Sequence, residues 1–536
     1  LSLIFEFNFQ YIVKIASLLL LFSALTLILK IKNLNSVRLI FKKKSIDLYL
    51  IILIFILLFL ISASPITHAD SIDYHFLGAL DLINNGHLSK EILPMHKNLV
   101  SVGEIIIAIG LSLKAEQFGG IMQFLSLFSL IPLFTNEKLK KNLLLLVLIC
   151  PITFFLVSSP KPQLLFSIST LLIFIFLTEK ANKLNSNQLK IIFPLVILIL
   201  SLNSLAKYSF YLSSTLLGIY FLFINLKKKL FLYSITSIVL IFSITILPYW
   251  LFRYVYYDTQ FLDLIISPLP INIYGYNGLQ NLVTSGSISS FSIFFPKSLK
   301  EFSTSYGPLL LLLPLIIDRE IFKNKLPVLI LLIFFISVIV FGGVLPRFLF
   351  EGFLWLVYLV SKYPKYNIFS NKILPRLIYV QLIPILIIYS FFIITIFPGS
   401  LNQNFKDKVM RQNANGYELS QWTNDKLDEE DILLTTHRSL SLFSNKSYAT
   451  IFTWYVKPSN KNSMQYFDFL KSKKINRILF YGEVLDKDIF EKCLGKELHY
   501  KKNVGRHVGR NPLNAKNYYN GWIYEFNYTE LPNCLF

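Results

Sequence analysis

Residues 50–60 read LIILIFILLFL and contain no charged side chain. They form the middle of an apolar segment, 46–63, whose length is close to the ~20 residues that an α-helix needs to cross a bilayer. Residues 143–150 (LLLLVLIC) form another uncharged run, and similar segments recur as far as residue 397. A soluble domain cannot bury so many apolar helices, so the sequence predicts an all-α polytopic membrane bundle.

The composition supports this class. Hydrophobic residues make up 54% of the chain and charged residues 15%, whereas soluble domains carry roughly 25% charged residues. The net charge of +21 would suggest a nucleic-acid partner in a soluble protein. Here the excess Lys and Arg lies in short connections between apolar segments, where it reports membrane topology. We therefore expect the lipid bilayer, and no nucleic acid, as a partner.

The basic connections set the orientation. Six of them are assigned to the cytoplasm: 30–44, 138–141, 180–190, 227–229, 319–325 and 362–376. The other connections then fall outside: 64–99, 158–162, 206–208, 253–305 and 342–346. Because the two sets alternate, the sequence predicts about twelve crossing helices, at 11–30, 46–63, 118–134, 143–158, 163–178, 191–205, 208–225, 231–252, 306–318, 327–342, 347–361 and 377–397. Both termini then lie outside, and the first segment is a retained helix rather than a signal peptide.

The transmembrane domain is expected at residues 1–397, with two long outer loops at 64–117 and 253–305. Within the first loop, residues 73–84 suit an amphipathic helix on the membrane surface. Residues 100–113 are apolar, but counting them as a crossing would break the alternation of the basic connections. They are therefore predicted to be interfacial or re-entrant.

The chain changes character after residue 397. The last 139 residues carry 15 of the 31 acidic residues and no run of membrane length. Short apolar segments alternate there with helix-like ones, at 431–435, 477–481 and 522–526 and at 416–427 and 463–473 respectively. This pattern predicts a small extracytoplasmic α/β domain at 398–536. The polar residues around His437 and Arg438 form no recognisable motif and are predicted to be ordinary surface.

The first outer loop holds the densest set of reactive side chains. Four of the seven histidines lie in it, and residues 68–75 read HADSIDYH directly after the second apolar segment. Carboxylates at a membrane surface are costly unless they are paired or used, so Asp70 and Asp73 are functional candidates. Their i, i+3 spacing would place them on one face of a helix. The alternative interpretation is a solvated polar loop.

Asp70, Tyr74 and His75 form a D-x-x-x-Y-H pattern that resembles the motif of GT-C glycosyltransferases. These are polytopic enzymes that use polyprenyl-phosphate-linked sugars, and they include protein O-mannosyltransferases and lipid A aminoarabinose transferases. The resemblance is close in the first outer loop and otherwise extends to the layout of bundle and tail. The sequence departs from better-known members in two places: Ser71 replaces an acidic residue, and Pro94-Met95-His96-Lys97 stands nearest to a Pro-Pro element.

The resemblance implies an inverting sugar transfer from a polyprenyl-phosphate donor to a glycolipid, glycan or protein acceptor. Asp70 would be the general base, a role worth about 10²–10⁴-fold in rate. Substrate-positioning roles would fall to Asp73, Tyr74, His75, His96 and Lys97. The protein would lie in a bacterial cytoplasmic membrane, with its tail domain on the periplasmic side.

Four basic residues lie at predicted outer helix ends, against the usual trend: Lys161, Lys207, Arg253 and Arg347. We expect two or more of them to bind the phosphate of the lipid carrier, Arg through a bidentate fork and Lys as a point charge. The alternative is that they are snorkelling anchors at lipid headgroups. Glu104 is either a second active-site carboxylate or an N-terminal charge on the interfacial helix.

Metal and redox chemistry have weaker support. His68, Asp70 and His75 offer nitrogen and oxygen ligands, but no HExxH-like spacing accompanies them. No metal site is predicted, and a divalent cation is the only cofactor left open. Cys493 and Cys534 both fall in the predicted outer tail, where an oxidising compartment would favour a disulfide over two free thiols.

Two other functions share the substrate class. A transporter or flippase for a lipid-linked glycan would be expected to have broken helices and charges near the membrane midplane. An O-antigen-type polymerase or ligase would place its chemistry in the later outer loop, 253–305, which is long enough to allow it.

Overall fold

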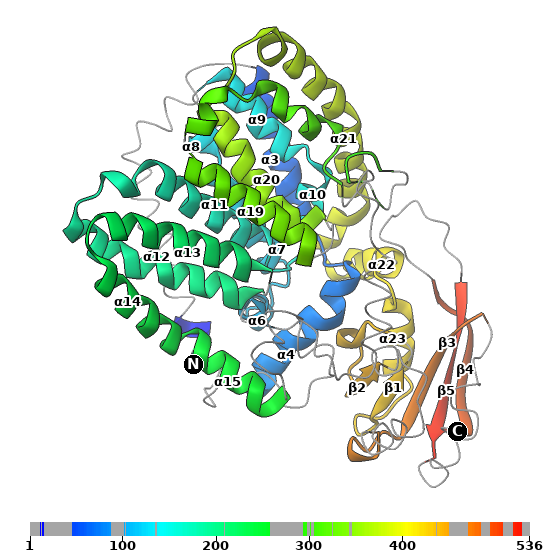
Figure 1. The fold of residues 1–536 in the computed structure, drawn as a ribbon. Coiled ribbons are helices and arrows are strands. Elements are labelled where there is room, and N and C mark those ends of the chain that lie inside the picture. The colour runs from blue at the N-terminus through cyan, green and yellow to red at the C-terminus, as the bar shows by residue number, and fades with distance from the viewer. Residues whose placement is uncertain are drawn as a thin grey trace.

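The structure is a computed structural model (Figure 1). It describes residues 11, 13–15, 46–86, 101, 103–134, 137–207, 209–257, 293–296, 301, 305–323, 325–341, 346–435, 437–449, 470–483, 494–506 and 518–527. Most of the predicted first helix (11–30) and most of the second outer loop (253–305) lie outside the described residues, as does most of the predicted tail helix 463–473.

The chain is a helical membrane protein. Among the described residues, five helical segments are long and apolar enough to cross a membrane: Leu164–Lys183, Ser186–Ala206, Phe210–Lys227, Phe231–Val255 and Phe369–Ser400. A bent pair, α9 (Lys138–Leu148) and α10 (Pro151–Val157), adds a sixth if it is counted as one span. Shorter apolar helices occupy Ile46–Ser62, Phe118–Phe134 and Lys325–Val340.

Helix α12 (Ser186–Ala206) shows how the sequence specifies these elements. Asn185 and Gln188 form a capping box, in which each side chain accepts a hydrogen bond from the other residue's backbone N–H. Leu189 and Phe193 then face the bundle and are fully buried, whereas Ile191 is exposed. Large apolar side chains are also exposed on other helices, with Leu232 at 79% and Ile394 at 75% exposure. Exposed apolar faces of this extent indicate contact with lipid.

Most predicted apolar segments form helices close to their expected positions. The elements are α3 (Ile46–Ser62), α7 (Phe118–Phe128), α8 (Ile131–Phe134), α11 (Leu164–Glu179), α13 (Phe210–Lys227), α14 (Phe231–Ile244), α15 (Ile246–Tyr257), α19 (Lys325–Phe341), α20 (Pro346–Lys362) and α21 (Leu374–Ile396). The predicted helix 143–158 is instead the bent pair α9–α10, with a 62° break. Pro151 stands at the start of α10 and cannot donate the backbone bond that would continue α9.

One predicted span is not an α-helix. Residues 306–318 contain the 3₁₀-helix η3 (Pro308–Ile316). Pro314 lies inside it and would clash with the carbonyl of residue 310 in an α-helix. At ~2.0 Å per residue, the 3₁₀ segment is more extended than an α-helix of the same length. Its Leu309, Leu313 and Ile316 are buried, whereas Leu311 and Leu315 are exposed, so the segment packs on the bundle with one side.

Contacts between helix ends occur at two separate ends of the bundle. At one end of the bundle, Tyr358 donates to Glu179 (2.6 Å) and Tyr366 donates to Glu137 (3.0 Å). At the other end, Lys161 and residues beside the ends of α12 and α20 meet in the cluster described below. The contacted connections thus fall in two groups.

The first outer loop is a helical layer beside this second end. The π-helix η1 (Ser71–His75) runs directly into α4 (Phe76–Asn85), and Gly86 ends α4 in a left-handed conformation (φ 72°). Helix α6 (Glu104–Ser112) packs on α4 and is too short to cross a bilayer. Buried Leu82, Ile107 and Phe252 join these two helices to α15.

The tail forms a helical linker and a five-stranded sheet. Helices α22 (Gln403–Asn413) and α23 (Tyr417–Asn424) precede strands β1 (Leu433–Thr435), β2 (Ser447–Ala449), β3 (Arg477–Gly482), β4 (Leu494–Arg506) and β5 (Tyr518–Phe526). The strand order is β2-β1-β3-β5-β4; β1 pairs in parallel with β2 and β3, and the β3–β5 and β5–β4 pairs are antiparallel. Trp422 of α23 packs on the sheet.

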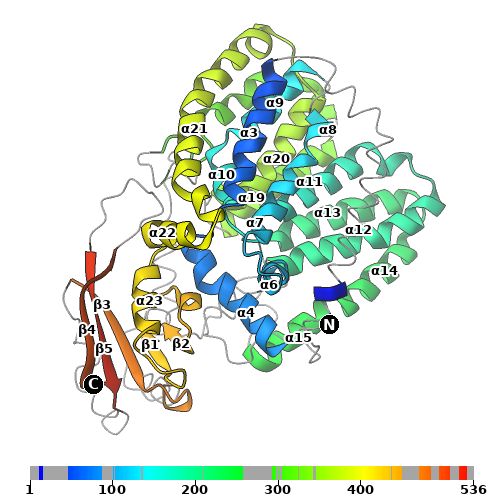
Figure 2. The ribbon, with the colours of Figure 1, turned by 180° about the vertical axis from the view of Figure 1, so that it is seen from behind.

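The tail docks on the first outer loop. Figures 1 and 2 show α23 between α4 and strands β3–β5 from both sides. Ile72 of η1 is buried against Met410 and Ala414, and the Ser441 hydroxyl donates to the Ile72 carbonyl. Lys406 pairs with Glu116 at 2.8 Å. Apolar and ionic contacts together fix the tail against this loop.

Candidate functional site

Asp70 and Lys161 form a buried ion pair at the centre of the site. Asp70 directly precedes η1, and Lys161 lies between Pro160 and Pro162 in the short connection from α10 to α11. The Nζ–Oδ2 distance is 2.5 Å, and the Lys161 side chain is 1% exposed. Desolvation of both charges is tolerable only because each neutralises the other.

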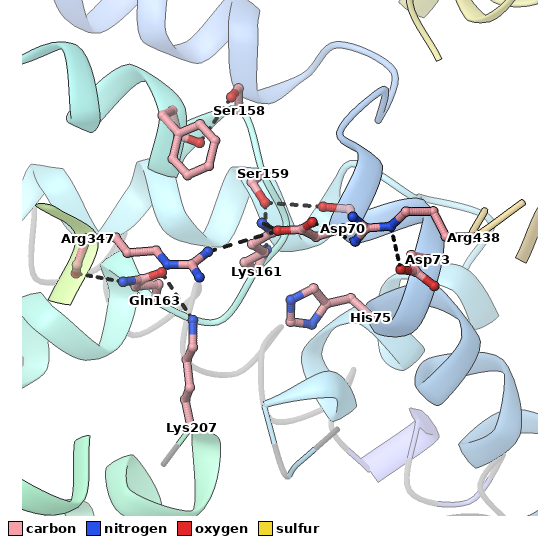
Figure 3. A network of polar contacts seen from close by, with 12 residues as sticks. Asp70, Asp73, His75, Ser158, Ser159, Lys161, Gln163, Lys207, Arg347 and Arg438 are labelled. Atoms are coloured by element: carbon pink, nitrogen blue, oxygen red, sulfur yellow. Dashed lines mark hydrogen bonds and ion pairs between the residues drawn. The ribbon is translucent and has the colours of Figure 1, made fainter. Parts of the chain in front are cut away.

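Arg438 bridges the two loop carboxylates. Its Nη2 donates to Asp70 Oδ1 and its Nε donates to Asp73 Oδ2, each at 2.9 Å (Figure 3). The prediction that Arg438 is ordinary surface is therefore wrong. The contact joins residues 368 and 365 positions apart, and no local pattern around Arg438 indicates it.

Two further basic residues extend the cluster. Arg347 is the second residue of α20, and its Nη1 lies 4.0 Å from Asp70 Oδ2. Lys207 follows α12, and its Nζ donates to Gln163 Oε1 (3.2 Å); Gln163 Nε2 donates in turn to the Arg347 carbonyl (2.7 Å). Both cationic groups lie within 6 Å of the Phe348 ring, at 5.9 and 5.1 Å from its centroid.

The cluster carries more basic than acidic groups. Lys161, Lys207, Arg347 and Arg438 are set against Asp70, Asp73 and the neighbouring Glu104. Burial and the charge of Arg347 lower the pKa of Lys207 to about 7, although Glu104 and Asp70 act in the opposite direction. Arg347 and Arg438 remain 30% and 35% exposed. An anion that reaches them would relieve the repulsion among the cations.

Anion affinity should therefore depend on pH. Lys207 is protonated below its pKa of about 7 and neutral above it, so affinity should fall as pH rises through 7, by up to about tenfold per pH unit. We expect this in titrations of the full chain in detergent with polyprenyl monophosphate as the probe. Lys207→Arg, which stays charged, should flatten the profile above pH 7. Lys228→Gln, at an exposed position on the far end of α13, should not alter it.

His75 and Glu104 form a separate buried pair within the same region. His75 Nδ1 lies 2.5 Å from Glu104 Oε1, and both side chains are almost fully buried. Glu104 Oε2 also accepts the Ser101 backbone N–H at 2.7 Å. A Cβ on Gly103 would lie 2.7 Å from the Ala206 carbonyl oxygen, so glycine allows α6 to approach the end of α12. Burial lowers the pKa of His75, although its hydrogen bond to Glu104 opposes the shift.

The remaining predicted site residues are placed as follows. Tyr74 is buried, with its ring centroid 4.2 Å from that of His75. Arg253 is buried on α15, where Nη1 donates to Tyr249 of the same helix (3.0 Å). His96, Lys97, Cys493 and Cys534 lie outside the described residues.

The candidate metal ligands do not converge. Asp70 is paired with Lys161 and Arg438, and His75 with Glu104. Within the described part of the chain, no three His, Cys, Asp or Glu side chains gather as a metal site would require. The chemistry of this region is that of ion pairs and hydrogen bonds.

Two protein-family models match the chain. The family model described as the DUF1420 N-terminal domain matches residues 2–410. The chain belongs to the DUF1420 family. A second model, the DUF1420 C-terminal domain, matches residues 411–536, so Arg438 comes from the C-terminal DUF1420 domain and its two carboxylate partners from the N-terminal one. No curated protein matches this DUF1420 chain.

Proposed function

We propose that this protein is a membrane glycosyltransferase that moves a sugar from a polyprenyl-phosphate carrier to an extracytoplasmic glycolipid, glycan or protein. In this proposal about twelve segments cross the membrane, and the C-terminal domain lies on the extracytoplasmic side. The bundle, its uneven distribution of Lys and Arg, and the grouping of helix ends support this topology.

The observation that carries the proposal is the cation-rich cluster at one end of the apolar helices. Lys161 precedes α11, Lys207 follows α12 and Arg347 is the second residue of α20, and Lys161 and Arg347 both face Asp70. A lipid-linked substrate needs apolar helices beside its chain and cations beside its phosphate. The ends of three apolar helices supply these cations.

The chemistry follows from the charges. The acceptor oxygen or nitrogen attacks the anomeric carbon, the bond from that carbon to the phosphate oxygen breaks, and polyprenyl phosphate leaves with the electron pair. Arg347 and Lys207 would neutralise the charge that grows on the departing phosphate, as preorganised cations do in phosphoryl sites. The acceptor's proton requires a base, for which the family resemblance points to Asp70.

The proposal can be tested without knowing the sugar. Cells lacking the protein should lose one glycosylated envelope component, identified by mass spectrometry of lipids, glycans and proteins, and the wild-type gene should restore it. Arg347→Gln should weaken binding of polyprenyl monophosphate and lower the restored product, whereas Lys228→Gln should do neither. Unchanged envelope glycosylation in the deletion strain would reject the transferase assignment.

A transporter or flippase remains the second candidate, and two observations favour it. The α9–α10 pair is broken by 62°, and Glu351 is buried on α20 beside Thr170 of α11 and Ser213 of α13. Buried carboxylates in the membrane often mark transport paths.

Glu351→Gln separates the two functions. A transferase whose chemistry lies at the helix ends should keep its product level in this variant, because Glu351 is not part of the cluster. A transporter that moves charge past Glu351 should lose activity. Transport of a fluorescent polyprenyl-phosphate lipid across proteoliposomes, compared between wild type and Glu351→Gln, gives the corresponding direct readout.

A further inference from the structure

The ion pairs of Asp70 raise a question about the base. Its Oδ2 is held by Lys161 at 2.5 Å and its Oδ1 by Arg438 at 2.9 Å. Charge-assisted hydrogen bonds of this length are about twice as strong as neutral ones. With a cation on each oxygen, the carboxylate is stabilised in its ionised form and is a weaker base toward an acceptor hydroxyl.

His75 is arranged differently. Its Nδ1 faces Glu104 Oε1 at 2.5 Å, whereas its Nε2 is buried and has no hydrogen-bond partner among the described residues. A buried ring nitrogen without a partner loses its hydrogen bond to water with nothing in exchange. Such an atom is retained at a cost to stability, which is reasonable if a substrate supplies the missing partner.

The surroundings of the ring point to the same reaction region. Figure 3 shows the His75 ring near the Asp70–Lys161 pair and the Lys207 side chain, and both lysines act electrostatically on the ring. Tyr74 packs against it. Burial and the two lysines keep the pKa of His75 below its ordinary value, with Glu104 as the opposing charge. The imidazole is therefore neutral at pH 7, the state in which Nε2 can accept a proton.

We propose that the His75–Glu104 dyad is the proton acceptor of the transfer reaction and that Asp70 organises the cations. This inference rests on the proposed glycosyl transfer. Glu104 accepts the Nδ1–H, which fixes the tautomer and leaves the Nε2 lone pair for the acceptor. Carboxylate-oriented histidines act in this way in nucleophilic and general-base catalysis.

The step balances without another reactant. The acceptor O–H or N–H gives its proton to His75 Nε2 while its oxygen or nitrogen forms the bond to the anomeric carbon. The bond from that carbon to the phosphate oxygen breaks, and its electron pair leaves on polyprenyl phosphate. Glu104 balances the imidazolium, which returns its proton to water or to the phosphate before the next turnover.

The test uses the full chain in membrane vesicles that carry their own donor lipids, with the product defined by the deletion strain. His75→Asn should lower the initial rate about 10²–10⁴-fold while the dissociation constant for polyprenyl monophosphate changes little. His75→Ala should regain part of the rate with added imidazole, a rescue that a purely structural residue would not give. If His75→Asn does not fold, His75→Gln serves for the same comparison, with thermal unfolding as the check.

The pH profile supplies the second readout. The wild-type rate should rise with pH through the lowered pKa of His75 and fall again through about pH 7 as Lys207 loses its proton. Glu104→Gln removes the charge that raises the pKa of His75, so the acidic limb should move to lower pH and the maximal rate should fall. A His75→Asn rate within about threefold of wild type, or an acidic limb unmoved in Glu104→Gln, would overturn the dyad. Absence of wild-type transfer would instead reject the proposed function.

Discussion

Asp70→Asn is expected to lower the free energy of unfolding by about 3–5 kcal/mol and to abolish transfer, because removal of one partner leaves a buried charge uncompensated. Lys161 is almost wholly buried and loses its 2.5 Å partner, and Arg438 loses one of its two carboxylates. Denaturant unfolding of the detergent-solubilised chain, followed by intrinsic fluorescence, measures the first effect. Product formation in the deletion strain measures the second.

A double variant separates the two effects. Asp70→Asn with Lys161→Met removes both charges of the buried pair at similar volume, so Lys161 no longer leaves an uncompensated charge. It should recover most of the lost stability but none of the activity, since the cations would no longer be arranged around Asp70. Recovery of transfer together with stability would mean that the pair serves folding alone.

Arg438→Gln should reduce transfer by about 10²-fold, a loss typical of removing one preorganised donor from a reaction site, and should loosen the tail. Asp73 is fully buried and its Oδ2 is bonded to Arg438 Nε, so the substitution deprives a buried carboxylate of its ion pair. Limited proteolysis should cut faster between the bundle and the sheet, while the bundle itself stays folded.

Arg477→Gln is the matched control. Arg477 pairs with Asp431 at 3.1 Å, so its ion pair lies within the tail domain. The same chemical change there should leave transfer and cleavage at the linker near wild-type levels. Equal losses in the two variants would show that Arg438 matters only for the folding of the tail.

The sequence predicted the positions of most bundle helices well, because each long apolar run identifies its own helix without information from distant residues. Residues 46–63 and 377–397 formed helices near their expected bounds. The error at 306–318 has a local contribution from Pro314, which removes one backbone hydrogen bond of an α-helix and is not registered by hydropathy. Strand β4 was not predicted, because its sequence lacks the pattern of a strand. Its sequence LGKELHYKKNVGR lies at the sheet edge and carries exposed charges, so no alternating apolar pattern marks it.

For the candidate site, the sequence indicated most of the residues but not their pairing. The spacing of Asp70, Asp73 and His75 is visible in eight consecutive letters, and the outer helix ends indicated Lys161, Lys207 and Arg347. The pairing of His75 with Glu104 and of Arg438 with both aspartates depends on how separate elements dock. A single sequence read by itself carries no record of such distant contacts.

The contact between Arg438 and Asp73 also bears on how the protein is made. A ribosome adds about 5–20 residues per second, so the 365 positions between these residues correspond to roughly 20–70 s of synthesis. During that interval the acidic pair is already at the membrane while its arginine does not yet exist. A prematurely terminated chain would keep nearly all its apolar segments and still lack the guanidinium that closes the site. Under the proposed transfer function, such incomplete products would be inactive.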